Sequence, residues 1–182
     1  MSPASDPPKM FPLMLNVTGV PVMLVGDNIA DRVETLQEYG AADLHVFPLA
    51  TLPGMSDFDR IKPRLVFIAD ADDDTASALR DLAHAVGAFV HVQDRIPLCD
   101  FHMPARIRRG HLQVTISTDG AAAGLSRVLR KHLETTVLGP EWTARVAELA
   151  QARRQWKAEG LATHEIARRL EAFIADRRWL DS

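Results

Sequence analysis

The segment Val25-Gly-Asp-Asn-Ile-Ala30 has the residue types and spacing of a phosphate-binding turn. An apolar run ends at Gly26, and a helical pattern begins a few residues later. Where a strand passes through glycine into a helix, free N–H groups and the positive end of the helix dipole attract the pyrophosphate of a dinucleotide. The pattern therefore predicts a cofactor site formed by the four loop residues Gly26, Asp27, Asn28 and Ile29.

This loop contains only part of the G-x-G-x-x-G pattern, because Gly26 is the one pattern glycine present. Asp27 adds a carboxylate, which repels a pyrophosphate unless the side chain turns away. Asp27 or Asn28 would also serve as N-cap of the following helix, so helix capping and cofactor contact remain open alternatives. We expect NAD binding to be weak or lost.

The second predicted strand ends without the acidic residue that would hold an adenosine ribose. The segment that follows offers only backbone and apolar contacts, at Leu49 and Ala50. These two residues complete the predicted cofactor site, and nothing in them distinguishes NAD from NADP.

Short apolar runs alternate with helical patterns over most of the chain. Strands are predicted at residues 21–25, 44–47, 64–69, 89–92 and 112–116, and helices at residues 31–39 and 75–86. This alternation predicts an α/β fold with a parallel, doubly wound sheet whose ligands bind at the carboxyl ends of the strands. After Gly124 the pattern changes to three predicted helices, at residues 125–133, 141–157 and 163–179.

The composition excludes several classes of function. A formal net charge of -3 argues against a general binder of nucleic acid or anionic membranes. The single cysteine, Cys99, rules out an intramolecular disulfide and a CxxC zinc site. No apolar stretch approaches the ~20 residues of a membrane span, and residues 1–9 lack the apolar core of a signal peptide. We expect a soluble cytoplasmic protein without a nucleic-acid or membrane partner.

Five blocks of sequence resemble the precorrin-2 dehydrogenase and sirohydrochlorin ferrochelatase family of siroheme biosynthesis. They are FVHVQD at 89–94, LCDFHMPA at 98–105, RRG at 108–110, ISTDG at 116–120 and LSRVLRKHLE at 125–134. A weaker similarity over Leu13–Gly40 extends the match to most of the chain. The resemblance implies oxidation of precorrin-2 to sirohydrochlorin with NAD, and in many members also the insertion of ferrous iron.

The resemblance also implies the domain organisation. It predicts a Rossmann-like NAD-binding-type domain at residues 1–110, a dimerisation segment at 111–138 and a helical C-terminal domain at 139–182. The predicted helix in the middle segment carries an apolar stripe, formed by Leu125, Val128, Leu129 and Leu133. Such a stripe serves a core as well as an interface, and the resemblance assigns it to a homodimer interface.

Asp94 matches the family's essential aspartate by position. A carboxylate at the C-terminal end of a strand can take a proton from a ring carbon or nitrogen and can steer a ferrous ion to the macrocycle. The resemblance therefore makes Asp94 both the catalytic and the metal-binding residue, whereas by itself it would serve equally as an Asx-turn residue before Pro97. Four contacts to the carboxylate-rich tetrapyrrole are predicted, from Arg108, Arg109, Ser117 and Thr118. For the two arginines, which belong to a basic run, a solvated surface role remains an equal alternative.

His91, His102 and His111 lie close in sequence to Asp94 and Asp100, and these residue types could form an iron site of imidazole and carboxylate ligands. Their spacing matches no standard metal signature, and we expect ordinary histidines.

The sequence departs from the family pattern around the predicted cofactor site. The Gly26 loop is shorter and poorer in glycine, and a helix and a strand are predicted to be missing before Arg64. His91 stands where the family usually has asparagine. Two hypotheses follow: an NAD-dependent dehydrogenase with or without iron insertion, and an NAD-independent tetrapyrrole-binding protein or chelatase that has lost dehydrogenase activity.

Overall fold

The computed structural model describes residues 9–180, with Ala123 described by its backbone alone. The polar tail at residues 1–9 therefore lies almost wholly outside the described residues. The chain divides into two compact units. The first runs to Met103 and includes Asp119–Ala121, and the second contains Pro104–Thr118 and the chain from Ala122 onward. The change of unit at Met103 precedes the predicted domain boundary at residue 110.

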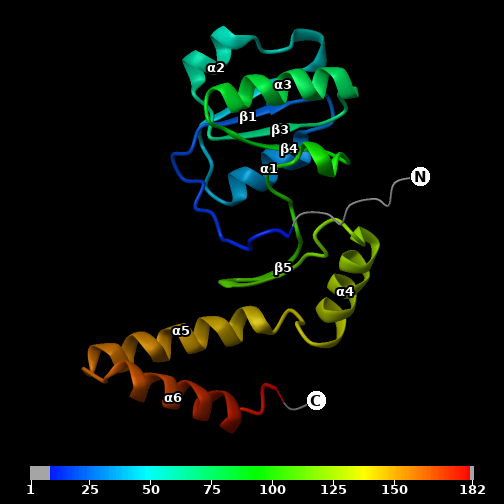
Figure 1. The fold of residues 1–182 in the computed structure, drawn as a ribbon. Coiled ribbons are helices and arrows are strands. Elements are labelled where there is room, and N and C mark those ends of the chain that lie inside the picture. Colours follow the sequence, from blue (N-terminus) through cyan, green and yellow to red (C-terminus); the bar gives the residue numbers. More distant parts are fainter. Residues whose placement is uncertain (1–8, 181–182) are drawn as a thin grey trace. The chain divides into compact units, whose positions relative to one another are not determined.

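The first unit is built on a four-stranded parallel sheet (Figure 1). Its strands are β1 (Val22–Val25), β2 (Leu44–Phe47), β3 (Leu65–Ile68) and β4 (Phe89–Val92), arranged in the order β2-β1-β3-β4. All three strand pairs are parallel. The predicted Rossmann-like α/β fold is confirmed, and each of these four strands lies where its apolar run predicted it.

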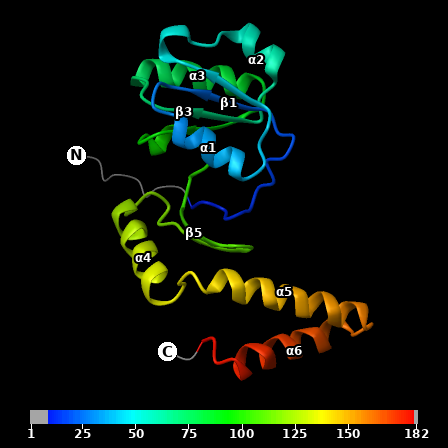
Figure 2. The same cartoon turned by 180° about the vertical axis from the view of Figure 1, so that it is seen from behind.

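Helices cover both faces of this sheet. Helix α1 (Ala30–Glu38) lies on one face, whereas α2 (Met55–Ile61) and α3 (Asp73–Ala85) lie on the other, as Figure 2 shows from behind. The face under α3 packs side chains such as Met23, Val66 and Leu79, and the opposite face packs Leu24, Phe67 and Leu36. Because both faces are covered, β1 and β3 are buried at every position, which explains their unbroken apolar sequences.

The strand order defines where a ligand would enter the sheet. From β1 the chain passes to β2 on one side, then returns to β3 on the other side of β1. The connections that leave the carboxyl ends of β1 and β3 therefore diverge, and this switch point is where open α/β sheets bind ligands. Gly26 directly follows β1, and Asp70 lies two residues after the end of β3.

The segment between β2 and β3 contains the 3-10 turn Leu49–Thr51 and helix α2, which the sequence patterns did not predict. No strand lies in this described segment, and the expectation that it is shorter than the family pattern by a helix and a strand stays a prediction. Phe58 of α2 is fully buried against the sheet. A helix of seven residues with few apolar positions shows little helical periodicity, so it could not be recognised from the sequence.

The second unit contains a β-hairpin and three helices. Strands β5 (Ala105–Arg109) and β6 (Leu112–Ile116) pair antiparallel, followed by α4 (Ala123–Thr136), α5 (Trp142–Ala158) and α6 (Thr163–Asp176). The alternation predicted residues 112–116 as a fifth strand of the parallel sheet. This prediction is wrong, because they pair with β5 instead. The turn at Gly110 (φ 59°) is far too short for the crossover that a parallel neighbour needs. Within residues 9–180, no helix combines the length and apolarity that crossing a membrane requires.

Candidate functional site

Gly26 holds the end of β1 directly against the end of β3. Its φ is +149°, and a Cβ built there would lie 2.7 Å from the carbonyl oxygen of Ala69. Its N–H donates to the Phe47 carbonyl at 2.9 Å, which extends the pairing with β2. Glycine is required here because any side chain would collide with the neighbouring backbone. The close approach brings the residues after Gly26 beside those after Ala69.

Asp27 turns away from α1, toward the residues after β2. Its carboxylate accepts a hydrogen bond from the backbone N–H of Leu49 at 3.0 Å. This side chain does not cap α1, since the N-cap residue is Ile29 and no side chain supplies the cap bond. The capping role predicted for Asp27 or Asn28 is therefore wrong, and Asp27 instead fastens the loop to β2.

Asn28 is engaged by a carboxylate that the sequence pattern did not single out. The backbone N–H of Asn28 donates to Oδ2 of Asp70 at 2.9 Å, and the Asn28 side-chain amide donates to the same oxygen at 3.1 Å. Asp70 is exposed and adopts a left-handed conformation with φ 58°. Its signal is an acidic residue just past β3, and this signal can be recognised only once β3 is known to lie next to β1.

The loop in this conformation does not fit a dinucleotide pyrophosphate. Two backbone N–H groups expected to contact the cofactor, those of Asn28 and Leu49, already donate to carboxylates of the chain itself. A pyrophosphate placed at the loop would meet two negative charges, Asp27 and Asp70, instead of open donors. Of the remaining predicted cofactor residues, Ile29 is buried and Ala50 is exposed in the 3-10 turn after β2.

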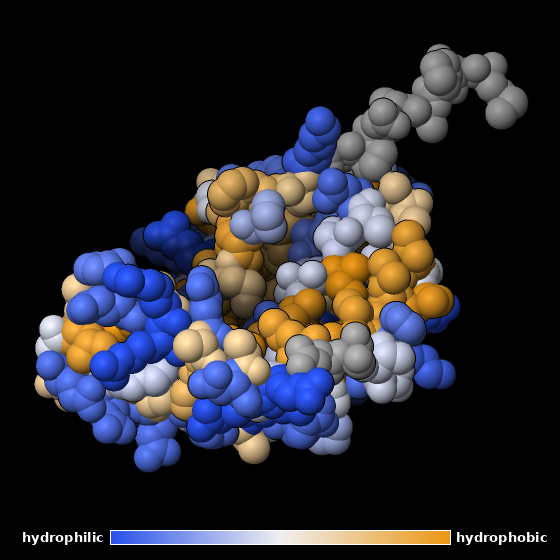
Figure 3. All heavy atoms as spheres, turned by 90° about the horizontal axis from the view of Figure 1, so that it is seen from below, coloured by the Kyte–Doolittle hydropathy of each residue, from blue (hydrophilic) through white to orange (hydrophobic). Residues whose placement is uncertain are grey.

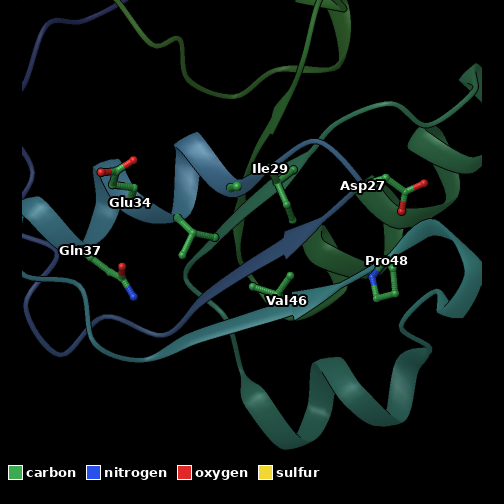
Figure 4. Close-up of a pocket in the computed structure, with 9 residues that line it drawn as sticks. Asp27, Ile29, Glu34, Gln37, Val46 and Pro48 are labelled. Atoms are coloured by element: carbon green, nitrogen blue, oxygen red, sulfur yellow. The ribbon is translucent and has the colours of Figure 1, made fainter.

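An open groove lies beside this loop, between α1 and β2 (Figure 4). Its volume is about 600 Å³. Glu34 and Gln37 project from α1, and Val46 and Pro48 lie opposite them on β2 and the residue after it. The carboxylate of Asp27 points away from α1. The groove therefore combines an apolar floor with an acidic and an amide side chain at one rim.

Asp94 occupies a position suited to chemistry at the carboxyl edge of the sheet. It lies two residues after β4, is exposed, and adopts a left-handed conformation with φ 59°. Non-glycine residues in this conformation are uncommon and collect at functional sites. No hydrogen bond or ion pair of its carboxylate is found among residues 9–180. The neighbouring Arg95, by contrast, is paired with Asp73.

His91 lies on β4, on the α1 face of the sheet, in an aromatic cluster with Phe67 and Phe101. Its Nδ1 is 3.1 Å from the carbonyl oxygen of Phe101, which can only accept, so Nδ1 carries the proton. Burial lowers the pKa of His91, and the positive charge of Arg32 lowers it further. His91 is therefore a neutral imidazole at pH 7.

The four residues predicted to bind the tetrapyrrole all belong to the second unit, but their surroundings differ. Arg109 is largely buried, and its Nε donates to the carbonyls of Leu138 and Gly139 at 2.9 and 3.1 Å. Its Nη2 also donates to Glu134 at 3.3 Å. These contacts join β5 to the end of α4, so the guanidinium of Arg109 already has a structural role.

Arg108, Ser117 and Thr118 are arranged differently. Arg108 is exposed, on the other face of β5 from the buried Ile107. Its Nε donates to the Gly110 carbonyl at 3.3 Å. Thr118 accepts a hydrogen bond from the backbone N–H of Ala122 at 3.1 Å, just before α4 begins. Ser117, the residue after β6, is exposed. Ser117 and Thr118 thus lie on the short connection from the hairpin to α4.

The described residues contain no group of three or more His, Cys, Asp or Glu side chains that could hold a metal ion. His91 and Cys99 approach each other to 3.7 Å, but Cys99 donates to the carbonyl of Val92 and burial raises the pKa of its thiol. Asp100, another candidate ligand, accepts hydrogen bonds from His84 and from the Val90 N–H, each at 2.8 Å.

Comparison with known proteins agrees with this fold. The family described as "Sirohaem biosynthesis protein central" matches residues 109–136. The siroheme synthase of Xylella fastidiosa (strain M12) is 31% identical over 162 residues, which cover 79% of this chain and 34% of that protein. The siroheme synthase of Gluconobacter oxydans (strain 621H) is 29% identical over 165 residues, again 79% of this chain and 34% of the relative. The chain belongs to the siroheme synthase family.

A solved structure titled "SirC, precorrin-2 dehydrogenase" has the same fold as this member of the siroheme synthase family. The TM-score is 0.70 at 21% sequence identity, over 94% of this chain and 93% of that chain. The chain spans about one third of the length of the siroheme synthases that it matches. The family predicted from the five sequence blocks is confirmed.

Proposed function

We propose that this chain binds a tetrapyrrole of siroheme biosynthesis and inserts ferrous iron into it without using NAD. The observation that carries the proposal is Asp94, an exposed carboxylate held in a left-handed conformation at the carboxyl edge of the sheet. It stands where the family's essential aspartate is expected. Family membership supports a tetrapyrrole as the substrate.

The chemistry of insertion suits a site of this kind. Sirohydrochlorin gives up two pyrrole N–H protons and gains bonds to Fe²⁺, and the oxidation state of neither partner changes. The step therefore needs a base and a group that steers the cation, but no hydride acceptor. In this proposal Asp94 attracts the ferrous ion, which is a substrate, and accepts one pyrrole proton, while solvent water takes the second.

We keep the substrate contacts predicted in the second unit as a proposal of their own. Arg108 supplies a guanidinium that pairs with a substrate carboxylate, and Ser117 and Thr118 supply hydroxyl groups. We favour Arg108 over Arg109 for this role because Arg108 is exposed, whereas the Arg109 side chain is largely buried beside Glu134 and backbone carbonyls.

We also propose that the chain forms a homodimer through α4. Leu125, Val128 and Leu129 are 50%, 63% and 39% exposed, so the stripe predicted from the sequence is open in the single chain. In Figure 3 hydrophobic residues gather at the right of the view, on the side where Figure 1 has α4. An exposed apolar stripe on one helix is suited to an isologous contact with the same stripe of a second copy.

The decisive experiment for the function is anaerobic iron insertion into sirohydrochlorin, followed by absorption spectroscopy, with wild type and Asp94→Asn. Asparagine keeps the shape, tolerates the left-handed conformation and removes the base. We expect the rate to fall ~10²–10⁴-fold, the usual cost of losing a positioned general base. Asp59→Asn, on the exposed side of α2, is the matched control and should insert iron at the wild-type rate. Unchanged turnover in Asp94→Asn would refute the assignment of Asp94 as the general base.

The second candidate is NAD-dependent oxidation of precorrin-2, which the fold match to a precorrin-2 dehydrogenase favours. It requires NAD at the loop of Gly26, Asp27, Asn28 and Ile29 and at Leu49 and Ala50, whose contacts do not fit the pyrophosphate. Anaerobic incubation of precorrin-2 with NAD separates the two candidates. NADH formation above the uncatalysed rate would establish the second.

A further inference from the structure

The contact between Asp70 and Asn28 places an internal anion where a dinucleotide would put its phosphate. One carboxylate oxygen of Asp70 accepts two hydrogen bonds from Asn28, at 2.9 Å from the backbone nitrogen and at 3.1 Å from the side-chain amide. Phosphate oxygens bind N–H groups at such turns in the same way. The two residues are 42 positions apart in the sequence, so the contact belongs to the folded sheet and not to a local turn.

We propose that Asp70 acts as a built-in substitute for the pyrophosphate and is the residue that makes this chain reject dinucleotides. Its position follows from Gly26, which lets the end of β1 lie against Ala69 and so brings Asn28 to the residue after Ala69. Asp70 adopts its left-handed φ of 58° at that point. Such a conformation is costly for most non-glycine residues, and the two hydrogen bonds to Asn28 help to hold it.

Two physical effects act against an incoming pyrophosphate. It must displace the Asp70 carboxylate from Asn28 to gain the same donor, and it must tolerate a negative charge at contact distance. Repulsion between unit charges about 4 Å apart in a water-exposed site alone weakens binding by about fivefold, and by much more where water is partly excluded. Asp27 adds a second carboxylate to the same loop, directed at Leu49.

The inference rests on one part of the proposed function, the independence of NAD, and does not depend on iron insertion. Asp70 follows β3 and Asp94 follows β4, and each is probed by a different measurement. Dinucleotide affinity reports on Asp70, whereas iron insertion reports on Asp94. A failure of either proposal can therefore be recognised without the other.

The test is calorimetric titration of the full chain with NAD, and separately with inorganic pyrophosphate, for wild type and two variants. Asp70→Gly removes the carboxylate, and glycine adopts the positive φ without strain. Asp70→Asn removes the charge but retains an acceptor for the Asn28 N–H. We expect Asp70→Gly to bind NAD at least about tenfold more tightly than wild type, with Asp70→Asn between them. Asp74→Asn, an exposed acidic residue in the first turn of α3, controls for net charge and should match wild type.

Several results would overturn the inference. Tight, low-micromolar NAD binding by wild type would show that Asp70 does not exclude the cofactor. NAD affinity in Asp70→Gly no higher than in wild type would show the same. If Asp70→Gly does not fold, Asp70→Asn decides, because it preserves the side-chain shape: affinity equal to wild type overturns the inference, and a gain of severalfold supports it.

Discussion

Replacing Gly26 by alanine should destabilise the first unit by about 2–6 kcal/mol. The new Cβ would lie 2.7 Å from the Ala69 carbonyl oxygen and 3.1 Å from both the Ala69 Cβ and a methyl carbon of Ile29. The closest of these atoms is backbone in the centre of the sheet, which cannot rotate away. Holding alanine at φ +149° costs about 1–3 kcal/mol, and relieving the overlap costs about as much again.

Urea unfolding followed by far-UV circular dichroism measures this loss. With a slope of about 2 kcal/mol per M, a loss of this size lowers the unfolding midpoint by roughly 1–3 M. Gly54→Ala is the matched control in the same unit, because Gly54 has a negative φ and nothing within 4 Å of a built Cβ. The control should lose less than about 1 kcal/mol, as expected for an exposed helix N-cap.

The outcome also bears on how Gly26 is used. If Gly26 serves only to leave room for a phosphate, Gly26→Ala should change ligand binding and leave stability within about 0.5 kcal/mol of wild type. A midpoint equal to that of Gly54→Ala would therefore refute the packing explanation. It would also remove the reason given for the contact between Asn28 and Asp70, since that contact depends on the close approach at Gly26.

Two further predictions concern assembly and pH. Leu129→Asp should convert the proposed homodimer into a monomer or unfold it, whereas Arg127→Asp, outside the apolar stripe, should not. Light scattering measures the oligomeric state of each variant. A monomeric wild type at micromolar concentration would contradict the proposed dimer. Because burial lowers the pKa of His91 below its unfolded value of about 6.5, the unfolded chain binds more protons in acid. The stability due to a neutral His91 is thus present above about pH 6.5 and is lost as the pH falls through the folded pKa. As the pH is lowered from 7.5, the urea midpoint should decrease less steeply for His91→Asn than for wild type. Equal decreases in the two proteins would show that protonation of His91 is not coupled to unfolding.

The sequence by itself determined the four strands of the parallel sheet, the α/β fold class and the family. The runs at Val22–Val25 and Leu65–Ile68 are continuously apolar because they are covered on both faces, and a pattern imposed by burial can be recognised locally. The family blocks between Phe89 and Glu134 were equally readable, since they depend on residue identity and spacing alone. Gly26 was identified from its place after a strand.

Only the tertiary structure decided which groups meet around that glycine. Asp27 accepts a hydrogen bond from Leu49, 22 positions away, and Asp70 accepts one from Asn28, 42 positions away, because the strand order brings these segments together. Residues 112–116 were predicted as a strand, but their partner depends on the tight turn at Gly110. A side chain's hydrogen-bonding capacity is a property of its residue type, whereas its partner is set by non-local packing, so the carboxylate that occupies the loop could not be found before the fold.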